Sequence, residues 1–242
     1  MGGWTGTWAA TGAAMKVCRT FFGIVLAFVA LAAQAQTAGV VEQVTGTLSA
    51  VRGGATRILS LKSEVQRGDT LATQRDSYAQ IRFSDGSTAT LRPNTTLRID
   101  EYQFDQKVPQ SDSIAMSLIK GGLRTVTGLI GKRGNEDAYK IQTSIATVGI
   151  RGSSGDTMDC MTGCEGVTSK SGGLAPGVYH VTYTDRYIMV TKQGQVLVGA
   201  GQFGFANDPN KPPVLLSGDP GLGLGPLPFA LGSSNPVQEC KF

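Results

Sequence analysis

The sequence contains a single histidine, and this scarcity removes several classes of function. With His180 as the sole imidazole, neither a zinc site of two or three histidines nor a His-x-x-x-His helix can form. A Ser-His-Asp triad would leave no spare histidine either. No residue near His180 in the sequence would activate it, and we expect it at a half-exposed strand position. We therefore expect a protein that is not an enzyme and needs no cofactor.

An excess of charge of one sign is also missing. The chain has 22 basic and 18 acidic residues, and Lys16 and Arg19 lie in a segment that we expect to be removed. Subtraction leaves 22 − 2 = 20 basic against 18 acidic residues, a net charge of about +2. Binding to nucleic acid through counterion release needs a clustered basic surface. The composition therefore argues against a nucleic-acid partner.

One long apolar run exists, and it lies near the N-terminus. Lys16 and Arg19 precede the run at 21–33, which ends in the small-x-small pattern Ala33-Gln34-Ala35. This order is typical of a secretory signal peptide, and the run is shorter than the roughly 20 residues of a permanent span. We expect translation to start at Met15, cleavage after Ala35 and a periplasmic mature chain, which could also be secreted or surface-exposed. An uncleaved anchor is the alternative.

Three cysteines follow the leader. In an oxidising compartment, Cys160 and Cys164 are expected to close a small disulfide loop. Cys240 could then be free, pair with a second chain or replace one member of the local bridge. The alternative for the loop is a metal site that adds its carboxylates, Asp156, Asp159 and Glu165.

The 33 glycines and 10 prolines favour turns and short strands over helices. From Tyr78 to Ser84, apolar side chains alternate with polar ones, which is the period of a half-buried strand, and Asp85-Gly86 supplies a hairpin turn. No segment keeps a helical period. We predict an all-β fold, solenoid-like or a sandwich, with further strands within residues 39–52, 87–92, 97–100, 116–127, 139–150, 178–190 and 195–205.

Two segments lack this alternation. Residues 153–176 are rich in Gly and Ser around the cysteines and are predicted to leave the sheet as an insertion. Residues 207–242 form a Gly/Pro/Leu-rich tail, in which 221–228 cannot form a ladder because proline lacks the N–H donor. We expect an extended, partly mobile tail after a β domain at 36–206, and the sequence leaves open whether the tail docks on the sheet.

Several segments resemble the FecR domain in order and spacing. They are Val44-Thr-Gly46, 67–73, 79–87, 91–99, 118–124 and 141–152. The resemblance implies an all-β fold and a protein partner in the cell envelope, with a role in envelope sensing or signalling. FecR-like transmembrane regulators carry a cytoplasmic helical domain before one span and pass a receptor signal to a sigma factor. Here a signal peptide precedes the domain, so we do not expect this chain to relay a signal across the membrane alone.

Other motifs have structural explanations. Arg67-Gly68-Asp69 and Asp85-Gly86-Ser87 are predicted to be turns rather than an adhesive tripeptide and a catalytic acid, and residues 126–133 lack the spacing of a phosphate loop. The polar strand faces carry three arginines that could form a ledge for an anionic envelope polymer: Arg82, Arg92 and Arg98. We favour a binding module for an envelope protein. The alternatives are a structural or adhesive surface component, held by the tail and Cys240, and a binder of anionic polymers.

Overall fold

The fold is described from a computed structural model, which describes residues 1–3, 6, 37–133, 135, 137–164, 173–224 and 227–229. All of its secondary structure belongs to one compact unit, Ala35–Phe242. The predicted leader, with Met15 and the cleavage after Ala35, lies outside the described residues, and so does Cys240.

Within these ranges the chain forms fifteen strands and two short 3-10 helices. The prediction of an all-β fold without long helices is confirmed. The elements are β1 (Thr37–Thr45), β2 (Leu48–Arg52), β3 (Ala55–Leu59), β4 (Glu64–Gln66), β5 (Thr70–Thr73), β6 (Tyr78–Phe83), β7 (Thr88–Leu91), β8 (Thr96–Gln103), η1 (Pro109–Ser111), β9 (Ser113–Val126), η2 (Ile130–Lys132), β10 (Tyr139–Gln142), β11 (Thr147–Asp159), β12 (Val178–Thr191), β13 (Gly194–Gly199), β14 (Phe203–Ala206) and β15 (Val214–Leu216).

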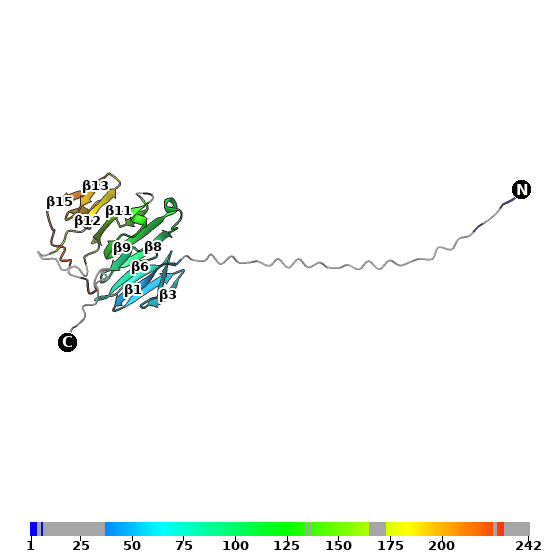
Figure 1. The fold of residues 1–242 in the computed structure, drawn as a ribbon, viewed down its shortest axis with the longest axis horizontal. Coiled ribbons are helices and arrows are strands. Elements are labelled where there is room, and N and C mark those ends of the chain that lie inside the picture. Colours follow the sequence, from blue (N-terminus) through cyan, green and yellow to red (C-terminus); the bar gives the residue numbers. More distant parts are fainter. Residues whose placement is uncertain are drawn as a thin grey trace. The chain divides into compact units, whose positions relative to one another are not determined.

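The strand pairing defines two layers that share three long strands. Layer 1 has the order β4-β1-β6-β7-β9-β11-β12-β14-β15, and layer 2 has the order β3-β2-β5-β8-β9-β10-β11-β12-β13. Residues 113–120 of β9 pair with β8, whereas residues 121–126 pair with β11 and, in part, with β7. Only β9 and β10 pair in parallel among the described strands. In Figure 1 the strands follow one another broadly in chain order, from blue to orange.

A residue with positive φ occupies nine of the points where the chain passes from one layer to the other, whereas the described residues between β9 and β10 include none. Such residues turn the strand direction sharply, and glycine, aspartate and asparagine tolerate this conformation best. At Gly121 the turn also brings two strands together, because an added Cβ would lie 2.7 Å from the Cα of Thr95. The nine residues are Gly46, Lys62, Gly68, Asp76, Asn94, Gly121, Gly152, Asp185 and Gly201.

The main core lies between the two layers. Its large buried side chains include Ile81 and Leu91 from layer 1 and Tyr187 from layer 2. Phe83 stacks on Tyr102 with ring centroids 5.5 Å apart, which joins the inner faces of the layers. Burial of these apolar side chains is the dominant stabilising contribution.

His180 also lies in this interior, so the prediction of a half-exposed position is wrong. Its side chain is fully buried, with Nδ1 3.0 Å from Thr157 Oγ1 and the ring centroid 4.1 Å from that of Tyr187. Burial lowers the pKa of His180 to about 3, although the carboxylate of Asp156 opposes this. The imidazole is therefore neutral at physiological pH.

The predicted insertion at 153–176 is wrong at its start, because residues 153–159 belong to β11 and pair with β9 and β12. The glycine and serine content that suggested a loop has another cause. A Cβ on Gly155 would lie 2.5 Å from the carbonyl oxygen of Val181 and 3.0 Å from Cε1 of His180. Small residues are needed here for close packing.

The predicted tail contains structure that the sequence did not reveal. Residues 214–216 form β15, which pairs with β14 at the edge of layer 1. Residues 217–224 form no strand, as expected, but Leu222 is only 1% exposed. At least this part of the tail docks on the β domain.

Candidate functional site

The outer face of layer 1, which points away from the main core, is crossed by a continuous row of side chains. Residues directly opposite one another on paired strands point to the same side of a sheet. The row is polar from β6 to β11 and apolar from β12 to β15. Its members are Gln80, Thr90, Arg124, Asp156, Val181, Phe203 and Leu216.

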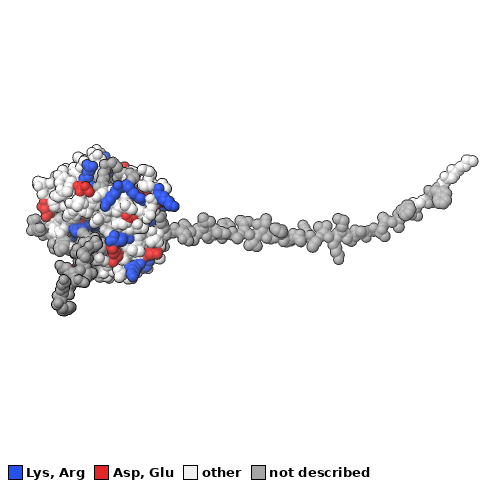
Figure 2. All heavy atoms as spheres, viewed as in Figure 1, with Lys and Arg blue, Asp and Glu red and all other residues white. Residues whose placement is uncertain are grey.

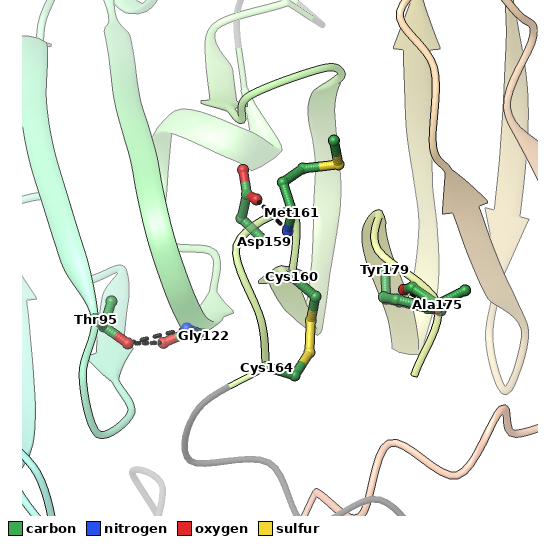
Figure 3. Close-up of a disulfide and its surroundings, with 8 residues drawn as sticks. All are labelled: Thr95, Gly122, Asp159, Cys160, Met161, Cys164, Ala175 and Tyr179. Atoms are coloured by element: carbon green, nitrogen blue, oxygen red, sulfur yellow. Dashed lines mark hydrogen bonds between the residues drawn. A yellow bond between two sulfur atoms is a disulfide. The ribbon is translucent and has the colours of Figure 1, made fainter. Parts of the chain in front are cut away.

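The polar and apolar halves of this face meet over Gly122. A Cβ at this position would lie 2.8 Å from Cδ of Arg92 and 2.5 Å from Sδ of Met158. Both side chains thus lie flat across β9, where only glycine leaves room. The same glycine exchanges hydrogen bonds with Thr95, whose Oγ1 lies 2.9 Å from the Gly122 nitrogen and 3.0 Å from its carbonyl oxygen (Figure 3).

Asp156 is the centre of the polar half. Its buried carboxylate accepts hydrogen bonds from Arg92 Nη2 at 3.0 Å, from Arg124 Nε and Nη2 at 2.8 and 2.6 Å, and from the Tyr183 hydroxyl at 2.6 Å. Burial would raise the pKa of Asp156, but the hydrogen bond from Arg124 and the two guanidinium charges together lower it. Two cations against one anion leave this cluster with one positive charge in excess.

Next to this cluster lie polar atoms that the fold leaves unpaired. They are Oε1 and Nε2 of Gln80, Oγ1 of Thr90 and Nε of Arg92, all buried and without a hydrogen-bond partner in the described structure. A buried polar group without a partner costs about 1–3 kcal/mol, and most native structures contain few of them. Their concentration on one face marks hydrogen-bonding capacity that folding does not use.

The apolar half forms a second hydrophobic cluster, separate from the main core. Met158, Tyr179 and Leu222 are its large buried members, and the ring of Phe205 packs at a tilt against that of Tyr179 with centroids 4.7 Å apart. The cluster also includes Cys160, and the predicted disulfide between Cys160 and Cys164 is confirmed (Figure 3). The bridge closes the loop that leaves β11 beside this cluster.

The three arginines of the predicted ledge do not form one exposed surface. Arg82 pairs with Glu42 at 2.7 Å, and Arg98 pairs with Asp100. Arg92 is only 3% exposed and is bound to Asp156. The sequence placed Arg92 on the correct side of the sheet, but Arg92 is buried there and not exposed to solvent. On the face drawn in Figure 2, basic and acidic side chains are interspersed.

The two turn motifs have the structural roles that the sequence suggested. Asp69 is fully buried, accepts a hydrogen bond from the Gln66 nitrogen at 2.8 Å and pairs with Arg57. Asp85 accepts hydrogen bonds from the nitrogen of Ser87 at 3.0 Å and from that of Ile130 at 3.1 Å. Both carboxylates hold turns and are not presented to solvent.

The carboxylates proposed as alternative metal ligands are engaged elsewhere. Asp156 binds the two arginines, and Asp159 accepts hydrogen bonds from the nitrogens of Ser144 at 2.9 Å and Met161 at 3.2 Å. Glu165 lies outside the described residues. Among the residues that are described, no group of three or more histidine, cysteine or acidic side chains is arranged to hold a metal ion.

The two-layered architecture defines an all-β domain, and part of its sequence matches a known family. Residues 69–162 match the sequence model of the family described as FecR protein. The chain therefore carries a FecR domain, and the resemblance noted in the sequence is confirmed. The matched segment includes Gln80, Thr90, Arg92, Arg124 and Asp156 of the outer face. No curated protein sequence matches the chain.

Two crystal structures of a "putative anti-sigma factor" from Parabacteroides distasonis ATCC 8503 are similar in part. They superpose with TM-scores of 0.45 and 0.44 at 13% and 12% sequence identity, over 62% of this chain and 60% of that protein. The chain thus matches less than two thirds of the length of these structures. In the ranges that the structure describes, no helix has the length and apolar character to cross a membrane.

Proposed function

We propose that this chain is an exported, non-enzymatic FecR-like domain that binds a protein partner in the cell envelope and takes part in envelope signalling. The FecR match over residues 69–162 supports a place among envelope signalling domains. The basic head and apolar run before Ala35 support export to the periplasm.

The observation that carries the proposal is the set of unpaired polar atoms on the outer face of layer 1. Gln80, Thr90 and Arg92 keep donors and acceptors that nothing in the described fold uses. Beside them lies an apolar cluster of aromatic and methionine side chains. Protein–protein interfaces typically combine an apolar centre with surrounding polar groups that form hydrogen bonds to the partner.

The state of His180 supports a non-enzymatic role. General acid–base catalysis at neutral pH works best with a pKa near the working pH and with access to the substrate. His180 is fully buried, and its pKa is lowered to about 3. The alternative of an anionic-polymer binder is less well supported, because the three arginines that suggested it are each paired with a carboxylate.

Site-specific photo-crosslinking in intact cells tests the proposal. A photoreactive amino acid replaces Val40, which is 39% exposed on the outer face of layer 1, or Ile58, which is 70% exposed on the outer face of layer 2. We expect a discrete product that mass spectrometry identifies as one envelope protein. If neither position yields a product beyond the chain itself, partner binding is wrong.

A further inference from the structure

Two described parts of the C-terminal segment, residues 217–224 and 227–229, contact the same face that carries the unpaired polar atoms. The segment leaves β15 at one edge of layer 1, and Leu222 is then buried against the cluster of Met158 and Tyr179. Further along, the ring of Phe229 meets that of Tyr78 edge-on, with centroids 6.5 Å apart. Tyr78 is the first residue of β6, so the described parts of the segment contact both the apolar half of the face and the start of β6.

This contact relies on apolar side chains rather than on strand pairing. Residues 217–224 form no strand, and Asp219 Oδ1 accepts hydrogen bonds from the nitrogens of Gly221 and Leu222 within the segment itself. Backbone pairing would add a regular series of hydrogen bonds to the sheet. Because residues 217–224 form no strand, this part of the chain can leave the face without breaking a series of strand hydrogen bonds.

The segment complements only half of the face. Its leucines fill the apolar half, but the atoms of Gln80, Thr90 and Arg92 remain buried without partners. Its side chains are mostly those of glycine, leucine and proline, and proline has no N–H to offer. In the structure that has Leu222 docked, the polar half is thus buried without compensation.

We infer that the outer face of layer 1 is the partner-binding surface and that residues 217–229 are an intramolecular occupant that competes with the partner. The inference rests on the proposed function. The occupant that fits the whole face is an extended segment of the partner protein. Leucine-like side chains would fill the apolar half, and backbone groups with one carboxylate would satisfy the polar half and the excess charge near Arg92 and Arg124.

Competition has a measurable consequence. A tethered segment acts at an effective concentration in the millimolar range. A competitor binds only the molecules in which the face is open, so its apparent affinity is its intrinsic affinity multiplied by the open fraction. Opening the face should therefore raise the affinity for an added ligand without changing the face itself.

The test uses a fluorescent synthetic peptide with the sequence of residues 217–229 and the full mature chain. Leu222→Lys should release the segment, because it places a cation in an apolar site next to a cluster with excess positive charge. We expect fluorescence anisotropy to show at least about tenfold tighter peptide binding to this variant than to the unmodified chain. A peptide that itself carries Leu222→Lys should bind neither protein.

Leu215→Lys is the matched control, because Leu215 is 43% exposed on β15 and lies outside the second hydrophobic cluster. It should bind the peptide as weakly as the unmodified chain does. If Leu222→Lys lowers the folded fraction, a protease site inserted after Ser217 and cut after folding opens the face by another route. The labelled peptide should then exchange into the cut protein. Equal binding to the closed and opened forms, or no binding to the opened ones, overturns the inference.

Failure of the inference is distinguishable from failure of the proposed function. If a discrete envelope protein is crosslinked from Ile58 but not from Val40, and no peptide binds, the proposed function holds but the outer face of layer 1 is not the binding surface. If the peptide binds the opened chain but no envelope protein is crosslinked, the C-terminal segment does occupy the outer face, but the proposed function as a partner-binding domain is wrong.

Discussion

At β7 both faces of layer 1 are buried, but the polar groups of the two faces differ in how they are satisfied. Leu91 points to the main core and Thr90 to the outer face, and both neighbours on β7 are fully buried. On the inner face the polar Thr125 finds the hydroxyl of Tyr187 at 3.2 Å, whereas Oγ1 of Thr90 has no partner within the described structure. The interior keeps single unpaired atoms, such as Nε2 of His180, whereas on the outer face the unpaired atoms of Gln80, Thr90 and Arg92 lie side by side.

The largest effect is expected at Asp156, the one carboxylate that pairs with both Arg92 and Arg124. Asp156→Asn keeps the shape of the side chain but leaves Arg92 and Arg124 buried without a counter-charge. Breaking a buried ion pair in this way typically costs about 3–5 kcal/mol. Urea denaturation of the two proteins measures the loss of unfolding free energy.

Asp100→Asn is the matched control for this substitution. It removes the partner of Arg98, whose side chain is half exposed, and exposed pairs contribute roughly 0–1 kcal/mol. Similar losses in the two variants would mean that the cluster on the outer face is solvated like an ordinary surface pair.

The inner face should respond to pH through His180, which is the sole histidine. Its pKa in the folded protein is about 3, below the ordinary value of 6.5, so the unfolded chain takes up the proton first as the pH falls. Stability should therefore decrease from pH 6.5 downward, by about 1.4 kcal/mol per pH unit and about 2 kcal/mol by pH 5.

His180→Phe should flatten this dependence between pH 6.5 and 5, because no other histidine titrates there. Denaturation midpoints at several pH values give the slope. An unchanged slope in the variant would show that the interior position of His180 does not cause the acid sensitivity.

The sequence predicted what depends on local pattern. The alternation of Ala79, Ile81 and Phe83 identified both β6 and its inner side, and Asp85-Gly86 identified the hairpin, because period and turn preference are properties of neighbouring residues. The spacing of Cys160 and Cys164 likewise indicated their bridge.

What the sequence could not show depends on residues far along the chain. Arg92 looks like a solvated residue on a polar face, and its burial depends on Asp156, 64 positions away. Gly155 resembles a loop residue until the ring of His180 is placed against it. The unpaired atoms of Gln80 and Thr90 emerge only when all contacts of the outer face are known. The candidate site was therefore less predictable than the fold.

The smallest effect on stability gives the sharpest contrast between the two faces. Thr90→Val replaces an unpaired buried hydroxyl with a methyl group of the same shape, so we expect no loss of unfolding free energy and a gain of up to about 1 kcal/mol. Thr125→Val makes the same chemical change on the inner face, where it removes one hydrogen-bond partner of the Tyr187 hydroxyl and should cost about 1 kcal/mol. Crosslinking from Val40 should fall in the first variant and persist in the second, because only Thr90 offers its hydroxyl to a partner. A Thr90→Val protein that is destabilised, or that captures its partner undiminished, would mean that the unpaired hydroxyl has no role in binding.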